Sequence, residues 1–287
     1  MRHIFSVYRK HVAVLLALML AVSMLPAEAA SAASVKLNRR SASVLVEKSI
    51  RLSVSGTKKT VKWSSSDSSV ASVSKGKVTG KKPGKVTITA KVSGKTLKCN
   101  VTVKYNAAAA EKKLVKSTQN LPTGILIRYT NKNSYPISVS AKMSFRDAVK
   151  TAISVEEDHN YCLEAGKSSY FFFKKPVDSN YQYITYTDYK LSLKTKASPY
   201  KGYTEDITQW CKPGVGTMSM TAYNYSGKDL TAAKISCLLY DSRGKVTGYI
   251  SYFPGCLKKG THIEENINYP TYLTNPSQVK TFVDYAY

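Results

Sequence analysis

Residues 63–90 read WSSSDSSVASVSKGKVTGKKPGKVTITA, and this stretch decides the fold class of the chain. Its end alternates with a period of two, so that Val86, Ile88 and Ala90 fall on one face of an extended chain. At its start, serines surround Asp67, and Ser and Asp side chains commonly bond the backbone of a turn. No His or second acid lies close in sequence to activate a serine. The stretch therefore predicts strands and a turn, and neither a serine nucleophile nor a disordered tract.

The alternation extends to both sides of this stretch. In LKCNVTVK (97–104) the residues expected to face inward are Leu97, Cys99, Val101 and Val103. Glycines interrupt the segment about every ten residues, which is the spacing of an antiparallel sandwich and not of alternating strands and helices. Trp63 follows Val61 by two residues, so we expect it to point inward and fill the space between two sheets.

The order of these motifs resembles a known family. VKLN, KSIRLSVSG, the quoted stretch and a closing CNVTVK are similar to the bacterial Ig-like group 2 domain over residues 34–104. The pattern W-S-S-S-D-x-S-V-A-x-V, followed by G-x-V-T-G and G-x-x-x-I-T-A, carries the resemblance. It implies an Ig-like sandwich of the kind found in adhesins and beside surface enzymes, and it implies no catalytic residues.

The N-terminus predicts export. Arg2, Arg9 and Lys10 precede an apolar run over residues 12–25, and small residues suited to signal peptidase follow. We therefore expect a cleaved signal peptide at residues 1–30 and a secreted, extracellular product associated with the cell surface. An uncleaved anchor is the alternative, although the run is shorter than the roughly 20 residues of a membrane span. After signal removal we expect no stable membrane insertion.

The rest of the chain aligns with itself, which predicts two copies of one β unit at residues 121–197 and 215–287. Most matches lie 94 residues apart, and the ends YTDY and FVDY also agree. The matched pairs are Phe145 and Leu239, Asp147 and Asp241, Cys162 and Cys256, Gly166 and Gly260, Pro176 and Pro270, Asn131 and Asn224 after one gap, and Asp188 and Asp284 at the ends.

The second copy contains a clear turn. Asp241-Ser242-Arg243-Gly244 predicts a hairpin turn in which Asp accepts backbone hydrogen bonds and Gly takes a positive φ. With YNYSGKDLTAAKISCLLYDSRGKVTG and CLKKG, this copy resembles the FxLYD family, an extracellular Ig-like β-sandwich. The resemblance implies no enzymatic activity. The first copy departs from it, because SFRDAVK replaces LLYDSRG and the turn loses its Gly.

The predicted fold is thus all-β, with tandem Ig-like β-sandwiches after a cleaved signal peptide. Residues 105–120 are Ala- and Lys-rich without strand alternation, so we expect a linker there, with a short helix before Pro122. Residues 198–214 form a second bridge. Its aromatic residues, which include Trp210, favour packing against a neighbouring copy.

The five cysteines leave several pairings open. Cys99 and Cys237 lie on predicted inward faces, where a thiol acts as a small hydrophobe. Cys162, Cys211 and Cys256 occupy loop-like positions, so a disulfide is expected to be Cys162–Cys256 or Cys211–Cys256. Free thiols throughout are the other alternative.

No metal, cofactor or catalytic site emerges. His159 and His262 lie far apart in sequence, and Glu156-Glu157-Asp158 favours a solvated acidic turn over a calcium loop. Carboxylates from distant strands would have to converge for an active site, and the sequence selects no such pair. The alternating tyrosines of YQYITYTDY (181–189) suggest an aromatic row on one sheet face.

Charge supplies the functional hypothesis. Residues 35–104 hold 17 Lys and Arg against two acids, whereas the chain from residue 105 holds 23 against 15. Outside a cell such a cationic module meets anionic polymers. We therefore expect a non-catalytic binding or adhesion protein that docks on an anionic wall polymer, a glycan or a surface protein, and we expect no nucleic-acid partner. The alternatives are an accessory or catalytic part of a cell-wall or glycan hydrolase, and a structural spacer. The lysines expected to dock are Lys77, Lys81, Lys82 and Lys85.

Overall fold

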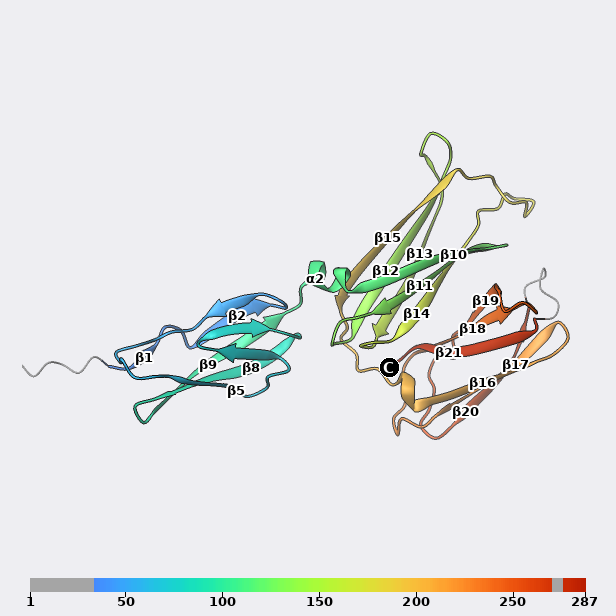
Figure 1. Ribbon diagram of the computed structural model, residues 1–287. Coiled ribbons are helices and arrows are strands. Elements are labelled where there is room, and N and C mark those ends of the chain that lie inside the picture. The colour runs from blue at the N-terminus through green and yellow to red at the C-terminus, as the bar shows by residue number, and fades with distance from the viewer. Residues whose placement is uncertain (1–33, 270–275) are drawn as a thin grey trace, which may run out of the picture.

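The computed structural model describes residues 34–269 and 276–287, so the expected signal peptide at residues 1–30 lies outside the described residues. The chain folds almost entirely into strands, which form three sandwiches, the third of which lies beside the second (Figure 1). This confirms the predicted all-β class of tandem Ig-like sandwiches. The sandwiches are named here the first, second and third units, and they span residues 34–104, 114–197 and 207–287.

The first unit is built as its sequence alternation predicts. A four-stranded sheet has the order β2-β9-β8-β5 and packs on a three-stranded sheet with the order β3-β7-β6; only β2 pairs with its neighbour, β9, in parallel. The expected inward residues of β8 are all buried, and Asp67 Oδ1 accepts the Ser69 N–H at 2.8 Å in the expected turn. The strands are β1 Lys36–Leu37, β2 Ser41–Leu45, β3 Ser49–Arg51, β4 Val54–Ser55, β5 Lys62–Ser65, β6 Ala71–Ser74, β7 Lys77–Gly80, β8 Gly84–Val92 and β9 Lys95–Lys104.

Trp63 packs against the core but stays partly exposed, because β5 is the edge strand of its sheet. Its ring lies over Gly76, which closes the turn between β6 and β7. Gly76 also holds the neighbouring strand, since its carbonyl accepts the Leu52 N–H at 2.7 Å. Trp63 therefore covers the core at the edge of the sandwich and does not fill its centre, contrary to the prediction from the sequence.

The expected linker at residues 105–120 is largely structured. Helix α2 (Ala107–Lys112) confirms the predicted short helix, but strand β10 (Leu114–Leu121) already belongs to the second unit. The Asn106 side chain accepts the Ala109 N–H and donates to the Val46 carbonyl at 2.9 Å, which ties the helix to the first unit. The boundary was misplaced because β10 is a mostly exposed strand with no apolar alternation.

The second and third units have the same topology, which supports the predicted duplication. Each pairs its first, second and fifth strands in one sheet and its third, fourth and sixth strands in the other. In the second unit these are β10, β11 Gly124–Asn131, β12 Ile137–Arg146, β13 Ala152–Leu163, β14 Ser168–Lys174 and β15 Asp188–Ala197. In the third they are β16 Ile207–Pro213, β17 Thr217–Asn224, β18 Ala233–Tyr240, β19 Val246–Tyr252, β20 His262–Asn268 and β21 Gln278–Ala286.

Asn131 and Asn224 hold the same corner in the two units. Both side chains are fully buried, and each Nδ2 group donates to the carbonyl of the residue four positions later. The Nδ2 group of Asn131 also donates to the Leu163 carbonyl, and that of Asn224 donates to the equivalent Leu257 carbonyl. Each backbone carbonyl accepts the N–H of Gly166 or Gly260. A buried amide with all these partners fixes the crossing between the two sheets of a unit. The predicted match of these residues is confirmed.

The Asp turns also match. Asp147 accepts the N–H of Thr151 as Asp241 accepts that of Lys245. Lys150 takes the place of Gly244 and keeps a positive φ of 68°, against 75° for the glycine. The first copy thus retains the turn without the residue that favours it.

The expected match of Asp188 with Asp284 is wrong. Asp188 opens β15 and pairs in register with Arg146, and the residue at this register in the third unit is Gln278, opposite Tyr240. Asp284 lies near the other end of β21. The similar YTDY and FVDY sequences therefore occupy opposite ends of equivalent strands. The expected match of Pro176 with Pro270 involves a residue outside the described part of the chain.

The bridge expected at residues 198–214 contains a 3-10 turn (Thr204–Asp206) and then strand β16, the first strand of the third unit. Its aromatic residues pack in part as expected: Tyr200 stacks on Tyr287 with ring centroids 3.9 Å apart, whereas Trp210 remains 51% exposed.

The cysteine positions were predicted in part. Cys99 and Cys237 are buried as expected, but Cys162 and Cys211 lie on β13 and β16 and not in loops. Cys256 is exposed in a loop, and all five thiols are free.

We expect Gly76→Ala to lower the free energy of unfolding of the first unit by about 2–4 kcal/mol and Gly94→Ala by about 1 kcal/mol. Both glycines have positive φ, of 80° and 72°. A Cβ at Gly76 would lie 2.3 Å from the Leu52 carbonyl oxygen, whereas one at Gly94 meets nothing within 4 Å. Urea unfolding followed by Trp63 fluorescence, in a Trp210→Phe background, measures both. Equal costs would contradict the close packing at Gly76.

Candidate functional site

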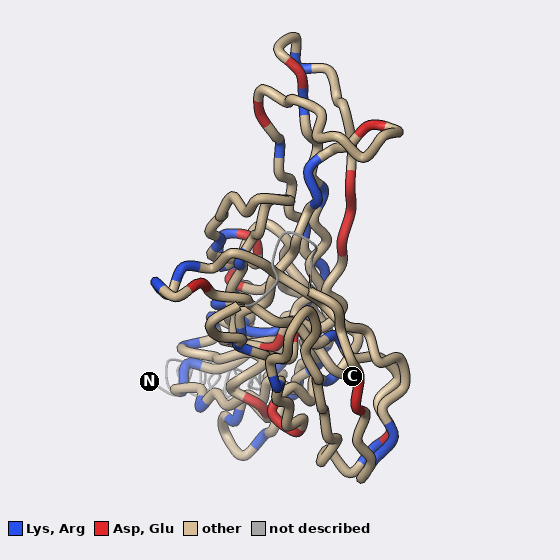
Figure 2. Tube along the Cα trace, turned by 90° about the vertical axis from the view of Figure 1, so that its right-hand side faces the viewer, with Lys and Arg blue, Asp and Glu red and all other residues tan. Residues whose placement is uncertain are grey.

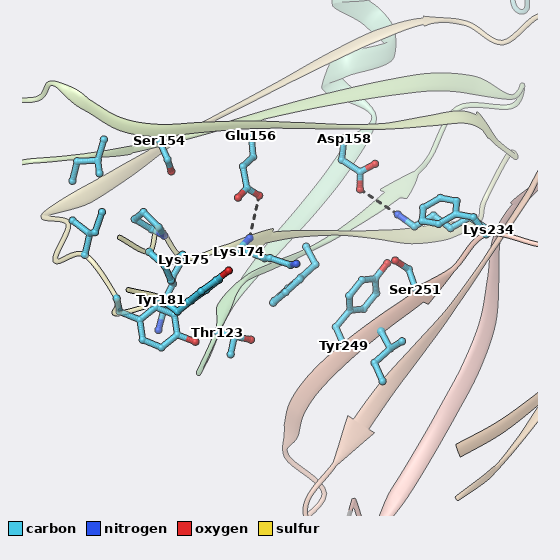
Figure 3. Close-up of a pocket in the computed structure, with 18 residues that line it drawn as sticks. Thr123, Ser154, Glu156, Asp158, Lys174, Lys175, Tyr181, Lys234, Tyr249 and Ser251 are labelled. Carbon is cyan, nitrogen blue, oxygen red and sulfur yellow. Dashed lines mark hydrogen bonds and ion pairs between the residues drawn. The ribbon is translucent and has the colours of Figure 1, made fainter. Parts of the chain in front are cut away.

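A cleft of about 1100 Å³ lies between the second and third units (Figure 3). Its walls come from β13, β14 and the loop after β14 on one side, and from β19 and Phe253 on the other. These three strands each pair with only one neighbour, so the cleft lies where the edges of three sheets meet. Side chains far apart in the sequence therefore face one space.

Aromatic side chains line the open part of the cleft. Tyr181, Tyr183 and Phe253 are 85%, 56% and 55% exposed. Asp178 shapes the loop that carries the two tyrosines, because its Oδ1 accepts the N–H groups of Asn180 and Gln182, each at 2.9 Å. Exposed rings held in a formed loop are available to a ligand at little further cost in entropy.

The aromatic row predicted from YQYITYTDY does not form. Residues 178–187 are a loop, and β15 begins only at Asp188. Tyr186 turns inward against Phe145, with ring centroids 4.8 Å apart. The spaced tyrosines therefore belong to a loop, in which Tyr186 packs into the core and Tyr181 and Tyr183 line the cleft.

Two carboxylates face the cleft from β13. Glu156 and Asp158 lie on one face of this strand, and Glu157 points the other way to Lys142 at 2.9 Å (Figure 3). The expected acidic turn is thus wrong, because these residues pair in register with β12. Glu156 Oε2 accepts the Lys174 N–H at 3.1 Å, and burial raises the pKa of this carboxyl. Asp158 Oδ2 binds Lys234 Nζ at 3.2 Å.

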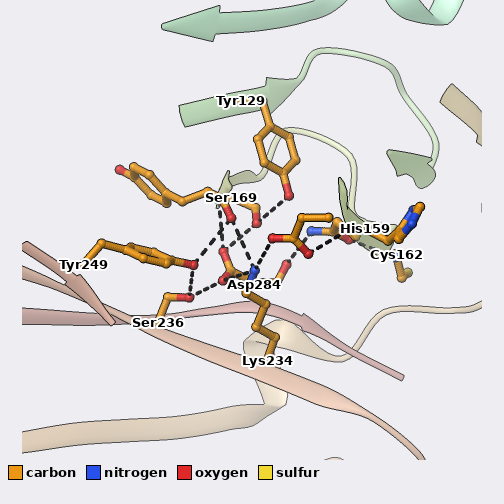
Figure 4. Close-up of polar contacts among 11 residues, drawn as sticks. Tyr129, His159, Cys162, Ser169, Lys234, Ser236, Tyr249 and Asp284 are labelled. Atoms are coloured by element: carbon orange, nitrogen blue, oxygen red, sulfur yellow. Dashed lines mark hydrogen bonds and ion pairs between the residues drawn. The ribbon is translucent and has the colours of Figure 1, made fainter. Parts of the chain in front are cut away.

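The inner end of the cleft is closed by a buried polar network (Figure 4). Asp284 at its centre is fully buried and accepts hydrogen bonds from the hydroxyls of Ser169 and Ser236 and from the Tyr170 N–H. Lys234, also buried, lies 4.0 Å from this carboxylate and 3.2 Å from Asp158. Burial raises the pKa of Asp284, while Lys234 and the hydrogen bonds act against the rise.

The network joins the two units. Asp284 and Ser236 belong to the third unit, and Ser169 and Asn160, which donates to the Asp284 carbonyl at 3.2 Å, belong to the second. An apolar cluster beside the network also draws on both units and contains Leu121, Leu126, Leu238 and Tyr249. The walls of the cleft are therefore held in one fixed relation.

The four predicted docking lysines are not gathered on one sheet. Lys77 opens β7 in the three-stranded sheet, whereas Lys85 lies on β8 in the four-stranded sheet. Lys81 and Lys82 follow β7 directly, roughly 13–17 Å along the chain from Lys77. Within the described residues none of the four has an acidic partner within 4 Å.

Positive charge instead covers the first unit as a whole. Its two acids are Asp67 and Glu47, and Glu47 is paired with Lys113 beyond the unit. In the rest of the molecule Lys and Arg are interspersed with Asp and Glu (Figure 2). The asymmetry of charge seen in the sequence is therefore an asymmetry between folded units.

Comparison with protein-family models matches residues 31–103 to the Bacterial Ig-like domain (group 2). The first unit is a bacterial Ig-like domain. Such domains occur in extracellular and surface proteins, so the match indicates a protein of this broad class. The match ends before β10, so it assigns no family to the second and third units. No curated protein matches the chain.

The described residues show no gathering of three His, Cys, Asp or Glu side chains suited to a metal ion. Over the same residues, neither helix is long and apolar enough to cross a bilayer. The sequence missed the cleft because its walls meet only through the packing of the two copies. The one available signal was the alternation of Ser154, Glu156 and Asp158, which predicts a shared face once this segment is taken as a strand.

We expect Asp284→Ala to lower the free energy of unfolding of the paired second and third units by about 3–5 kcal/mol, because it leaves Lys234 buried without its nearest buried anion. Asp188→Ala serves as the control. Asp188 is 33% exposed and pairs with Arg146 and Lys150, so its loss is expected to cost clearly less than the loss of Asp284. Thermal and urea unfolding measure both. A small effect at Asp284 would show that the network does not hold the units together.

Proposed function

We propose that the protein is a secreted, non-catalytic binding protein of the bacterial surface, whose first unit docks on an anionic wall polymer. The carrying observation is the charge of this unit: 17 Lys and Arg against two acids over residues 35–104. The cations lie on both sheets, and the four lysines named above are free of acidic partners within 4 Å among the described residues.

A distributed surface of this kind suits a flexible polyanion. Each lysine near a densely charged surface contributes about 1 kcal/mol, and many weak contacts add together. Such a ligand does not require the lysines to converge on one point, because the polymer can follow the unit around its edge. The proposal therefore holds although Lys77 and Lys85 lie on different sheets.

Binding of the protein to a glycerol phosphate polymer is expected to fall steeply between 50 and about 500 mM salt. Replacing Lys77, Lys81, Lys82 and Lys85 by Gln is expected to weaken it at least about tenfold at 150 mM salt. A matched control replaces the exposed Lys190, Lys194, Lys196 and Lys212 by Gln, which removes the same charge from the other units. Affinity measured by calorimetry should stay within about twofold in the control. Equal losses in both variants would refute a role specific to the first unit.

A second candidate function is the binding of a saccharide in the cleft. Exposed Tyr and Phe rings provide flat apolar faces for sugar rings, and Ser251, Lys174 and Glu156 provide polar groups beside them. A folded cleft that combines a few polar groups with aromatic faces is the usual form of a small-ligand site.

Hydrolysis in the cleft is less well supported than binding. Glu156 and Asp158 are the pair of carboxylates that a glycan hydrolase needs, and the raised pKa of Glu156 would suit a general acid. However, Asp158 Oδ2 binds Lys234, and its Oδ1 accepts the His159 N–H at 2.7 Å. Both oxygens of this carboxylate are therefore occupied by partners, which makes it a poor candidate for a nucleophile or base.

We expect uncharged oligosaccharides of N-acetylglucosamine or hexose to bind the cleft, and Tyr181→Ala or Phe253→Ala to weaken the affinity about tenfold. Tyr225→Ala is the control, since this ring is 64% exposed and does not line the cleft. Calorimetry measures the affinities, and a reducing-end assay with Glu156→Gln tests for cleavage. Release of reducing ends that Glu156→Gln abolishes would favour the hydrolase instead, and binding that survives both cleft variants would exclude this site.

The second and third units are proposed to be relatives of the FxLYD family, with the third the closer. Their shared topology and the common bonding of Asn131 and Asn224 support a single ancestral unit. A structural spacer would need neither the exposed rings of the cleft nor the excess positive charge of the first unit, so a spacer role is less well supported than either binding function.

A further inference from the structure

Two cysteines of the third unit face each other from its two sheets. Cys211 lies on the edge strand β16 and Cys237 on the central strand β18. Their Sγ atoms are 3.5 Å apart, and both side chains belong to the core cluster of the unit. Neither pairing expected from the sequence includes Cys237, because an inward-facing position on a strand predicts only a packing role for a thiol.

The backbone holds these sulfur atoms together. Strand β16 lies against β21, which is the sheet neighbour of β18. The Tyr203 N–H donates to the Ala286 carbonyl at 3.0 Å, and Gln209 Nε2 donates to that of Thr281 at 3.5 Å. The contact is thus set by strands fixed on both sides. A disulfide needs the sulfur atoms at about 2.0 Å, so a shift of about 1.5 Å would close it.

The duplicated unit shows that this pair is not required by the fold. Met143 occupies the position of Cys237, since they lie 94 residues apart in matching strands. Thr118, which pairs with Ile127, occupies the position of Cys211, which pairs with Met220. The second unit forms the same sandwich with Thr and Met, so the two thiols are a property of the third unit alone.

We propose that Cys211 and Cys237 form a disulfide that joins the two sheets of the third unit when the protein meets an oxidising environment. Cys211 is partly exposed and Cys237 is 1% exposed, so an external oxidant reaches Cys211 first. The hydrogen bond between the two thiols lowers the pKa of Cys211, whereas the same bond and burial raise the pKa of Cys237. We therefore assign Cys211 as the thiol that attacks the oxidant and Cys237 as the thiol that resolves the resulting mixed disulfide.

The reaction is a thiol–disulfide exchange with a donor disulfide, either oxidised glutathione or a thiol–disulfide oxidoreductase. The Cys211 thiolate attacks one donor sulfur, forms a mixed disulfide and expels the other donor sulfur as a thiolate. The Cys237 sulfur, after losing its proton, attacks Cys211 Sγ and releases the remaining donor thiolate. Two electrons pass to the donor disulfide, and the two protons of the protein thiols pass to solvent or to the donor thiolates.

The test uses the full protein with Cys256→Ser, which removes the exposed thiol and leaves four. After incubation with oxidised glutathione, the thiols counted in denaturant are expected to fall from four to two. Trypsin digestion is expected to yield peptides 202–228 and 235–243 joined by a bond that a reductant breaks, because each contains one of the two cysteines. Oxidation is expected to raise the Tm by about 5–15 °C.

The matched control carries Cys211→Thr and Cys237→Met in the same background, which copies the second unit. It is expected to fold, to show two thiols before and after oxidation and to keep its Tm. Four thiols after oxidation of the parent, or a joined peptide that contains Cys162 or Cys99, would overturn the proposal. The assay involves no polymer or saccharide, so its result is independent of the proposed function.

Discussion

The buried carboxylate of Asp284 is the constraint on which the arrangement of the second and third units depends. A charge without water must have partners, and here they are supplied by Ser169 of one unit and by Ser236 and Lys234 of the other. A rotation of one unit against the other would break the bonds that cross between them, which run from Ser169 and the Tyr170 N–H to Asp284 and from Lys234 to Asp158. The cleft inherits its shape from this requirement, since Lys234 and Tyr249 serve both the network and the cleft wall.

The second and third units have one topology but different edges and loops. Asn131 and Asn224 keep the same buried bonds, so the frame of the sandwich is shared. The differences lie elsewhere. The second unit contributes β13 acids and a tyrosine loop to the cleft, whereas the third contributes Lys234, Asp284 and the facing thiols. A frame specified by a few buried bonds leaves edges and loops free to change.

The sequence predicted those parts of the fold that depend on local periodicity. The alternation around Ile88, the turn at Asp67 and the match of Asn131 with Asn224 were all correct, because each is encoded within a short segment. Boundaries failed at the exposed strands β10 and β16, which carry no apolar alternation. The cleft and the Cys211–Cys237 contact could not be predicted, because both depend on how sheets and units pack, and no sequence spacing records that packing.

The junction between the first and second units gives the molecule a mechanical property. On the side of the second unit, the Asn133 side chain donates to the Ala110 carbonyl of α2 at 3.2 Å, and Tyr135 packs edge-on against Tyr105. On the side of the first unit, Glu47 pairs with Lys113, which directly follows the helix. Helix α2 is therefore bonded to both units. The first unit lies to one side of the paired second and third units (Figure 1), and these contacts limit how far it can turn against them. In the proposed mode of binding, with the first unit on an anionic polymer, the distance between the cleft and that polymer would be set by these contacts instead of by the statistics of a flexible linker.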